Sequence, residues 1–165
     1  MLRKLLAVSV GALALATAGP AAAGAQADRC TGKDIVQTAK AAGSFKTLTS
    51  LLDQAGLAQT LEGRGPFTVF APTDKAFSKV PQATLDALAS DKEQLRSVLL
   101  YHVANHELTA AKVAKRRSIK TLNGQRVGVR VRDGNVFVGG ARVVKPDVTA
   151  CNGVIHVINK VLIPR

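Results

Sequence analysis

The segment that decides the fold is GPFTVFAPTDKAFSKVP, residues 65–81. Its apolar run over residues 67–71 is typical of a buried strand, and the run ends at a proline. Thr73 and Asp74 follow at once, and an apolar pattern with helical spacing resumes at Ala76. The sequence therefore predicts a strand followed closely by a helix, with a hydroxyl and a carboxylate at the corner between them. Such a corner has two interpretations: a catalytic elbow or an ordinary helix start.

The local chemistry of this corner favours the helix start. The Thr73 hydroxyl can accept a hydrogen bond from a backbone N–H one turn into the following helix, and the Asp74 carboxylate suits the positive end of that helix. A catalytic elbow would need a G-x-S-x-G turn with an acid and a histidine after it, and the chain contains no such turn. We therefore predict that Thr73 and Asp74 contribute to stability.

The first 27 residues have the pattern of a secretory signal peptide. Arg3 and Lys4 precede an apolar stretch over residues 5–18, and small residues follow as far as Ala27. This stretch is shorter than the roughly 20 residues that span a bilayer, so it does not predict a transmembrane segment. We expect cleavage near Ala27 and a secreted or periplasmic protein made of residues 28–165.

The remaining 138 residues are the usual length of a single domain, in which helices come first and strands follow. Apolar positions at helical spacing predict helices over residues 34–42, 45–55, 84–88 and 91–102, with Ser44 as the cap of the second. Beyond residue 114, alternating valines and Asn-Gly, Asp-Gly and Gly-Gly dipeptides predict an antiparallel meander. Residues 154–163 form its most apolar strand. The sequence therefore predicts an α+β fold in which the strand at 67–71 joins the meander.

Positive charge is concentrated in the second half of the chain. Residues 28–107 carry nine Lys/Arg and nine Asp/Glu, whereas residues 108–165 carry twelve Lys/Arg against two Asp/Glu, a net charge of +10. A field of this size attracts polyanions.

Three arginines alternate along one predicted strand. Arg126, Arg130 and Arg132 alternate with valines, so one strand face would present three guanidinium groups to water, with Arg116 and Arg117 just upstream. Two interpretations stand side by side: a solvated face that keeps the protein soluble, and a docking site for an anionic surface partner.

Three stretches together resemble the fasciclin domain. GPFTVFAPTDKAFSKVP resembles its first conserved motif, LLYHVANHELTA at 99–110 its Tyr-His segment, and NGVIHVINKVLIP at 152–164 its second conserved motif. The resemblance covers residues 34–164 in the expected order. It implies a wedge-shaped β-sandwich with a cluster of helices packed on one side, and an extracellular adhesion or binding module that is not an enzyme.

The resemblance also points to adhesion candidates. Tyr101 and His102 belong to the segment that the family associates with cell adhesion, although a tyrosine at the end of an apolar helix face is more often part of the core. Pro146 and Asp147, within KPDVTACNGVIH at 145–156, are the residues retained from the Glu-Pro-Asp-Ile-Met adhesive segment of some animal members. Because the other three positions of that segment differ, we do not carry its receptor specificity over.

Cys30 and Cys151 are the two cysteines of the chain. In an exported protein, two cysteines so far apart favour one disulfide over a redox or metal pair. Cys151 stands where the family usually has Ser or Thr, and the resemblance implies a bridge that pins the N-terminal segment to the turn before the last strand. Asn152 and Gly153 are predicted to form that turn.

The three histidines offer a weaker metal hypothesis. His102 and His106 are spaced i, i+4 and Glu107 follows, but His102 also continues an apolar helix face and is better explained as a core histidine. His156 alternates with apolar residues in a buried strand and is predicted to be structural. We expect no metal and no cofactor.

Three classes of function follow from these patterns. The first is a secreted, non-enzymatic adhesion module for a cell-surface or matrix component, either a protein or an anionic polysaccharide. The second is an exported polyanion or nucleic-acid binder, which the aromatic content of 4% disfavours because bases need stacking partners. The third, a secreted hydrolase, would need a catalytic triad built on histidines that have structural explanations.

Overall fold

The computed structural model describes residues 32–164. The predicted signal peptide, its cleavage site and Cys30 lie outside these described residues. Within them, no helix is long and apolar enough to cross a membrane. The elements are, in chain order, α2 (Ile35–Ala42), α3 (Lys46–Gln54), α4 (Ala58–Glu62), β1 (Phe67–Pro72), α5 (Asp74–Phe77), α6 (Gln82–Ser90), α7 (Lys92–Tyr101), β2 (Val103–Ala104), α8 (Ala110–Ala114), β3 (Ser118–Lys120), β4 (Arg126–Arg132), β5 (Asn135–Val138), β6 (Ala141–Ala150) and β7 (Gly153–Ile158).

The strands form one seven-stranded sheet in the order β2-β1-β7-β6-β5-β4-β3. The run from β3 to β7 is the antiparallel meander that the dipeptide pattern predicts. The early strand β1 joins it parallel to β7, from the pair of Phe67 and Gly153 to the pair of Pro72 and Ile158. The strand predicted over 154–163 is shorter in the structure, where β7 ends at Ile158.

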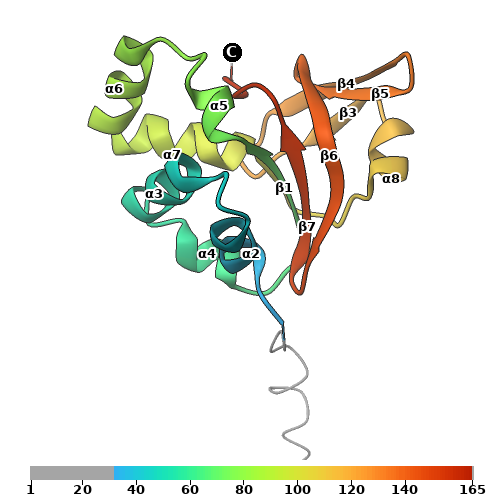
Figure 1. Ribbon diagram of the computed structural model, residues 1–165, viewed down its shortest axis with the longest axis horizontal. Helices are drawn as coiled ribbons and strands as arrows, with labels where there is room; N and C mark the ends of the chain where they lie inside the picture. The colour runs from blue at the N-terminus through green and yellow to red at the C-terminus, as the bar shows by residue number, and fades with distance from the viewer. Residues whose placement is uncertain (1–31, 165) are drawn as a thin grey trace, which may run out of the picture.

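Two apolar cores lie on opposite faces of β1 and β7, and every residue of these two strands is buried. Figure 1 shows α2 to α7 gathered on one side of β1 and β7, while α8 lies at the other end of the molecule beside β4 and β5. Val69 and Ile155 face the helices, whereas Phe70 and Ile158 face the second core with the valines of β4. Burial on both faces explains why these strands read as continuous apolar runs rather than as alternating ones.

The Pro-Thr-Asp corner is a helix start, with a second contact that the sequence did not predict. The Thr73 hydroxyl accepts a hydrogen bond from Ala76 N–H at 3.2 Å and so caps α5. The Asp74 carboxylate instead accepts from Lys46 N–H at 3.3 Å and from Thr47 N–H at 2.8 Å, at the start of α3. Asp74 lies in the first turn of α5, as the sequence predicts, and its carboxylate also lies at the positive end of α3, because the fold brings the two helix starts together.

The start of α3 also corrects the prediction for Ser44. No side chain of the preceding residues caps this helix, and Ser44 contributes its carbonyl, which accepts from Asp74 N–H at 2.9 Å. Asp74 and the start of α3 are therefore joined in both directions.

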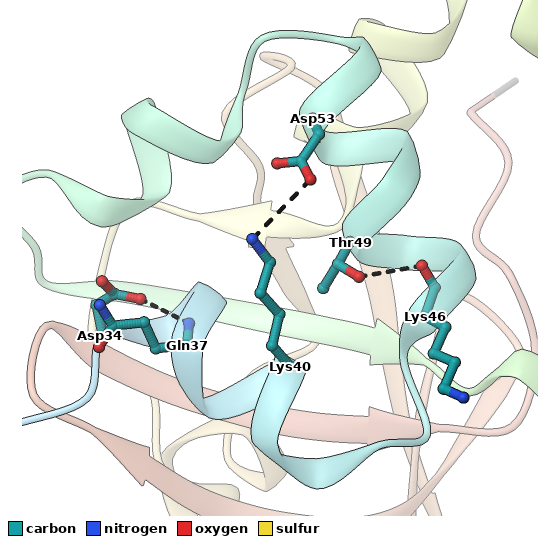
Figure 2. A network of polar contacts seen from close by, with 6 residues as sticks. All are labelled: Asp34, Gln37, Lys40, Lys46, Thr49 and Asp53. Atoms are coloured by element: carbon teal, nitrogen blue, oxygen red, sulfur yellow. Dashed lines mark hydrogen bonds and ion pairs between the residues drawn. The ribbon is translucent and has the colours of Figure 1, made fainter.

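Helices α2 and α3 are stabilised at their ends by local polar contacts, which Figure 2 shows from close by. Asp34 caps α2 by accepting from Gln37 N–H at 2.7 Å. Lys40 of α2 and Asp53 of α3 form an ion pair at 3.9 Å, with both side chains about half exposed. An exposed pair of this kind contributes little to stability, so the packing of the two helices rests on their buried apolar faces.

The Asn-Gly dipeptide at 152–153 joins three parts of the fold. The Asn152 side chain accepts from Ile35 N–H at 3.0 Å and donates to the carbonyls of Leu61 and Gly63. Gly153 is already the first residue of β7, and a Cβ at this position would lie 2.0 Å from the Phe67 carbonyl oxygen. The glycine is therefore needed for the close approach of β1 and β7, rather than for the turn that the dipeptide predicts.

The turn between β4 and β5 sets the register of the exposed end of the sheet. Asp133 and Gly134 both have positive φ, as a two-residue type I′ hairpin requires. The hairpin pairs Arg132 with Asn135 and, two residues further, Arg130 with Phe137. Paired residues of antiparallel strands point to the same face, so this turn decides which side chains accompany the arginines.

Candidate binding groove

The predicted alternation along β4 is present. Arg126, Arg130 and Arg132 are exposed on one face, while Val127 and Val129 are buried in the second core on the other. Val131, at the end of the strand, is 49% exposed, because the second core does not extend that far. The three guanidinium groups therefore lie on the outer face of the sheet, as the sequence predicts.

This outer face forms one wall of a groove of about 760 Å³. We call it the arginine groove; it is lined by Tyr101, Gln125, Arg126, Gly128, Arg130, Arg132, Phe137, Gly139, Gly140, Leu162 and Ile163. Nothing lies within 4 Å of the position that a Cβ on Gly128 would take, so no side chain covers β4 between Arg126 and Arg130. The groove thus combines three cationic side chains with an apolar wall from the C-terminal segment.

Tyr101 is half-buried and serves both packing and the groove. Its ring packs against the second core, and its hydroxyl lies 3.5 Å from the Arg126 carbonyl oxygen. The predicted packing role is therefore compatible with exposure of one side of the ring to the groove.

His102 is a core residue with both ring nitrogens occupied. It is 2% exposed; Nδ1 lies 2.7 Å from the Val98 carbonyl, and Nε2 accepts from Leu162 N–H at 2.9 Å. Burial lowers the pKa of His102 to about 4, although the hydrogen bond to Val98 opposes the shift. The neutral imidazole joins α7 to the C-terminal segment that forms the groove wall.

His156 is a second buried histidine, on strand β7. Its Nε2 donates to the Leu108 carbonyl at 2.6 Å, and its Nδ1 accepts from Asp147 N–H at 3.3 Å. Burial lowers the pKa of His156, against the hydrogen bond to Leu108 and the charge of Asp147. Its ring also stacks on Phe70 with the ring centroids 5.6 Å apart, so it has the structural position that the sequence predicts.

The metal hypothesis finds no support in the geometry. Helix α7 ends at Tyr101, so His106 lies in the exposed loop beyond it and the i, i+4 relation with His102 is lost. Among residues 32–164, no three His, Cys, Asp or Glu side chains are close enough together to hold a metal ion.

Comparison with known proteins identifies the family of this chain. The profile of the Fasciclin domain matches residues 43–164. The chain belongs to the fasciclin domain family. Its fold agrees with this: the structure of a FAS1 domain pair from the insect cell adhesion molecule Fasciclin I superposes with a TM-score of 0.67 at 20% identity, over 80% of this chain and 51% of that one. The α+β fold that the residue pattern predicts, and the fasciclin-like arrangement that the resemblance implies, are therefore confirmed.

Relatives of known sequence come from bacteria and animals. Protein sll1483 of Synechocystis sp. is 41% identical over 79% of this chain and 73% of its own length. Immunogenic protein MPB70 of Mycobacterium bovis is 36% identical over 96% of this chain and 92% of its own length. Transforming growth factor-beta-induced protein ig-h3 of Sus scrofa is 33% identical over 79% of this chain, which corresponds to only 19% of that longer protein.

The adhesion candidates of the fasciclin domain do not gather in one place. Pro146 and Asp147 lie at a register shift of β6, where Asp147 has a φ of 55° and its carboxylate accepts from Ala110 N–H at 2.8 Å. Asp147 therefore caps α8, and neither residue lines the arginine groove. Arg116 and Arg117 are exposed between α8 and β3 and also lie outside its lining.

The groove contains residues that the sequence reasoning missed. Phe137, Leu162 and Ile163 line it, and none of them was a candidate. For Phe137 a signal existed, because the Asp-Gly hairpin fixes the pairing of Arg130 with Phe137. No local signal marks Leu162 and Ile163, which reach the groove through the path of the chain after β7.

Cys151 occupies the turn between β6 and β7, next to the first described residues of the chain. Its Sγ lies 3.3 Å from the Gly32 carbonyl oxygen, and its N–H donates to the Lys33 carbonyl at 3.1 Å. The turn of the fasciclin domain is thus held against the segment that follows Cys30. Since Cys30 lies outside the described residues, the disulfide remains a prediction.

Proposed function

We propose that this fasciclin domain is a non-enzymatic binding module of an exported protein, and that its arginine groove docks an anionic polymer of a cell surface or matrix. The similarity to a cell adhesion molecule, Fasciclin I, supports a binding role. The predicted signal peptide supports export to the periplasm or beyond.

One observation carries the assignment of the groove. Arg126, Arg130 and Arg132 line a single concave surface, and none of the three forms an ion pair with an acidic side chain of the described residues. Guanidinium groups match carboxylate, sulfate and phosphate groups with two parallel hydrogen bonds. Three such groups in one groove are therefore suited to a polymer that carries repeated anionic groups.

The assignment can be tested by chromatography on immobilised acidic polysaccharide. In the test variant, Arg126, Arg130 and Arg132 are replaced by Gln, which removes the charge and keeps most of the side-chain stem. The matched control replaces the exposed lysines Lys75, Lys79 and Lys92, none of which lines the arginine groove, by Gln, so that the same net charge is lost elsewhere.

The groove variant should elute at clearly lower salt than the wild type, whereas the lysine control should elute close to it. Both variants should keep the melting temperature, because exposed charges contribute little to folding. Equal shifts for the two variants would show that retention follows net charge alone and would refute the groove as the docking site.

A further inference from the structure

The aromatic side chains of this protein that are only partly buried are confined to the arginine groove. The chain contains five Phe, one Tyr and no Trp, and all six aromatic residues lie in the described part. Phe45, Phe67, Phe70 and Phe77 are buried in the two cores. The two that keep accessible surface, Tyr101 and Phe137, both line the groove.

Phe137 lies between two arginines on the outer face of the sheet. The pairing across β4, β5 and β6 sets Arg130 opposite Phe137 and Phe137 opposite Arg142, so the three side chains point to the same face. We call these three residues the Arg-Phe-Arg row. Phe137 belongs to neither apolar core and is half-buried, and the accessible part of its side chain lines the groove, where it can contact a ligand.

Arg142 is held in place at both its backbone and its side chain. Asn159 accepts from Arg142 N–H at 3.0 Å and donates its own N–H to the Arg142 carbonyl at 3.1 Å. The guanidinium donates from Nε and Nη2 to Asn135 Oδ1, at 3.1 Å and 2.8 Å. These bonds hold the guanidinium against Asn135, two residues from Phe137 on the same face of β5, and leave further N–H groups of its fork for an anion.

The dimensions of the row suit a single sugar ring. Neighbouring strands are about 4.8 Å apart, so the Cα atoms of Arg130 and Arg142 are about 10 Å apart with Phe137 midway. A pyranose ring offers an apolar C–H face that can lie on an aromatic ring, and a uronic acid adds a carboxylate at the edge of that ring. A flanking guanidinium binds a carboxylate with two parallel bonds.

We propose that the Arg-Phe-Arg row is a subsite for one hexuronate residue of an acidic polysaccharide, with the sugar ring on Phe137 and its carboxylate held by Arg142 or Arg130. This rests on the proposed function, because it takes the anionic polymer to be a glycan. The flat ring distinguishes this ligand from a polyanion that carries only charges.

The test measures the affinity of three probes at one fixed salt concentration: oligogalacturonate, which has rings and carboxylates, poly-glutamate, which has carboxylates without rings, and single-stranded DNA. Phe137→Leu keeps the apolar bulk but removes the flat ring, and Phe137→Tyr restores the ring. Phe137→Leu should bind oligogalacturonate about fivefold more weakly and poly-glutamate unchanged, while Phe137→Tyr binds like the wild type. Arg142→Gln should weaken oligogalacturonate more than Arg142→Lys does.

The outcomes separate the subsite from the proposed function. Wild-type protein that binds neither oligogalacturonate nor poly-glutamate refutes the proposed function and the subsite together. Wild-type protein that binds both, with Phe137→Leu unchanged or weakened equally for both probes, refutes the subsite alone. A larger loss for single-stranded DNA than for oligogalacturonate would identify Phe137 as a platform for bases and overturn the sugar assignment. Thermal melts of each variant verify that it is folded.

Discussion

Asp74 links two helix starts, and its replacement by alanine gives a direct measure of that link. In Asp74→Ala, the N–H groups of Lys46 and Thr47 lose their carboxylate acceptor at the start of α3. Loss of a capping side chain costs typically about 1 kcal/mol, and the second, longer hydrogen bond adds a smaller amount. We expect a loss of about 1.5 kcal/mol in the free energy of unfolding, or about 5 °C in melting temperature for a domain of this size.

The pH dependence of this loss identifies the charge as its source. Burial alone would raise the pKa of Asp74, but hydrogen bonds from Thr47 and Lys46 outweigh it and lower the pKa below the ordinary value of 3.8. A lowered carboxyl pKa stabilises the folded state above pH 3.8, and this stabilisation is lost as the pH falls through the folded pKa. The difference between wild type and Asp74→Ala should therefore be constant from pH 7 to 5 and shrink below pH 4.

Urea unfolding followed by circular dichroism at several pH values measures both effects. Asp74→Asn should lose less than Asp74→Ala, because an amide oxygen still accepts but carries no charge. Glu62→Ala, at an exposed carboxylate of α4, serves as the control and should change little. A melting temperature of Asp74→Ala within about 1 °C of the wild type would refute the capping role.

Three further predictions concern the cores and the cysteines. Gly153→Ala should destabilise the protein by roughly 2 kcal/mol or more in urea unfolding, because the added Cβ would collide with the Phe67 carbonyl of β1. The control Gly128→Ala should be nearly neutral, and similar losses for the two variants would contradict the need for a glycine at position 153. The pKa of His102 is about 4 in the folded protein and 6.5 in the unfolded chain, so protonation of this residue should lower the free energy of unfolding by about 2 kcal/mol between pH 7 and pH 5. His102→Gln should reduce this pH dependence, and an unchanged slope would contradict the assignment to His102. Alkylation of the non-reduced exported protein should modify neither Cys30 nor Cys151, and mass spectrometry that finds two alkyl groups would exclude the disulfide.

Local patterns were enough to predict most of the elements. The Thr73 cap of α5, the alternation along β4 and the Asp-Gly hairpin each depend on residues within a few positions of one another. Such interactions form wherever the chain places a suitable side chain beside its own backbone, so the sequence alone specifies them. The three fasciclin motifs then indicated the arrangement of these elements.

The tertiary structure decided the contacts between distant segments. Asp74 lies beside its own helix start in sequence, yet its carboxylate caps α3, because a hydrogen bond depends on distance in space and not on separation along the chain. Parallel pairing of β1 with β7 requires a long crossover, which no turn dipeptide marks. The Arg-Phe-Arg row, likewise, exists only once β4, β5 and β6 are in register: the sequence supplies the arginines and the fold places an aromatic ring between two of them.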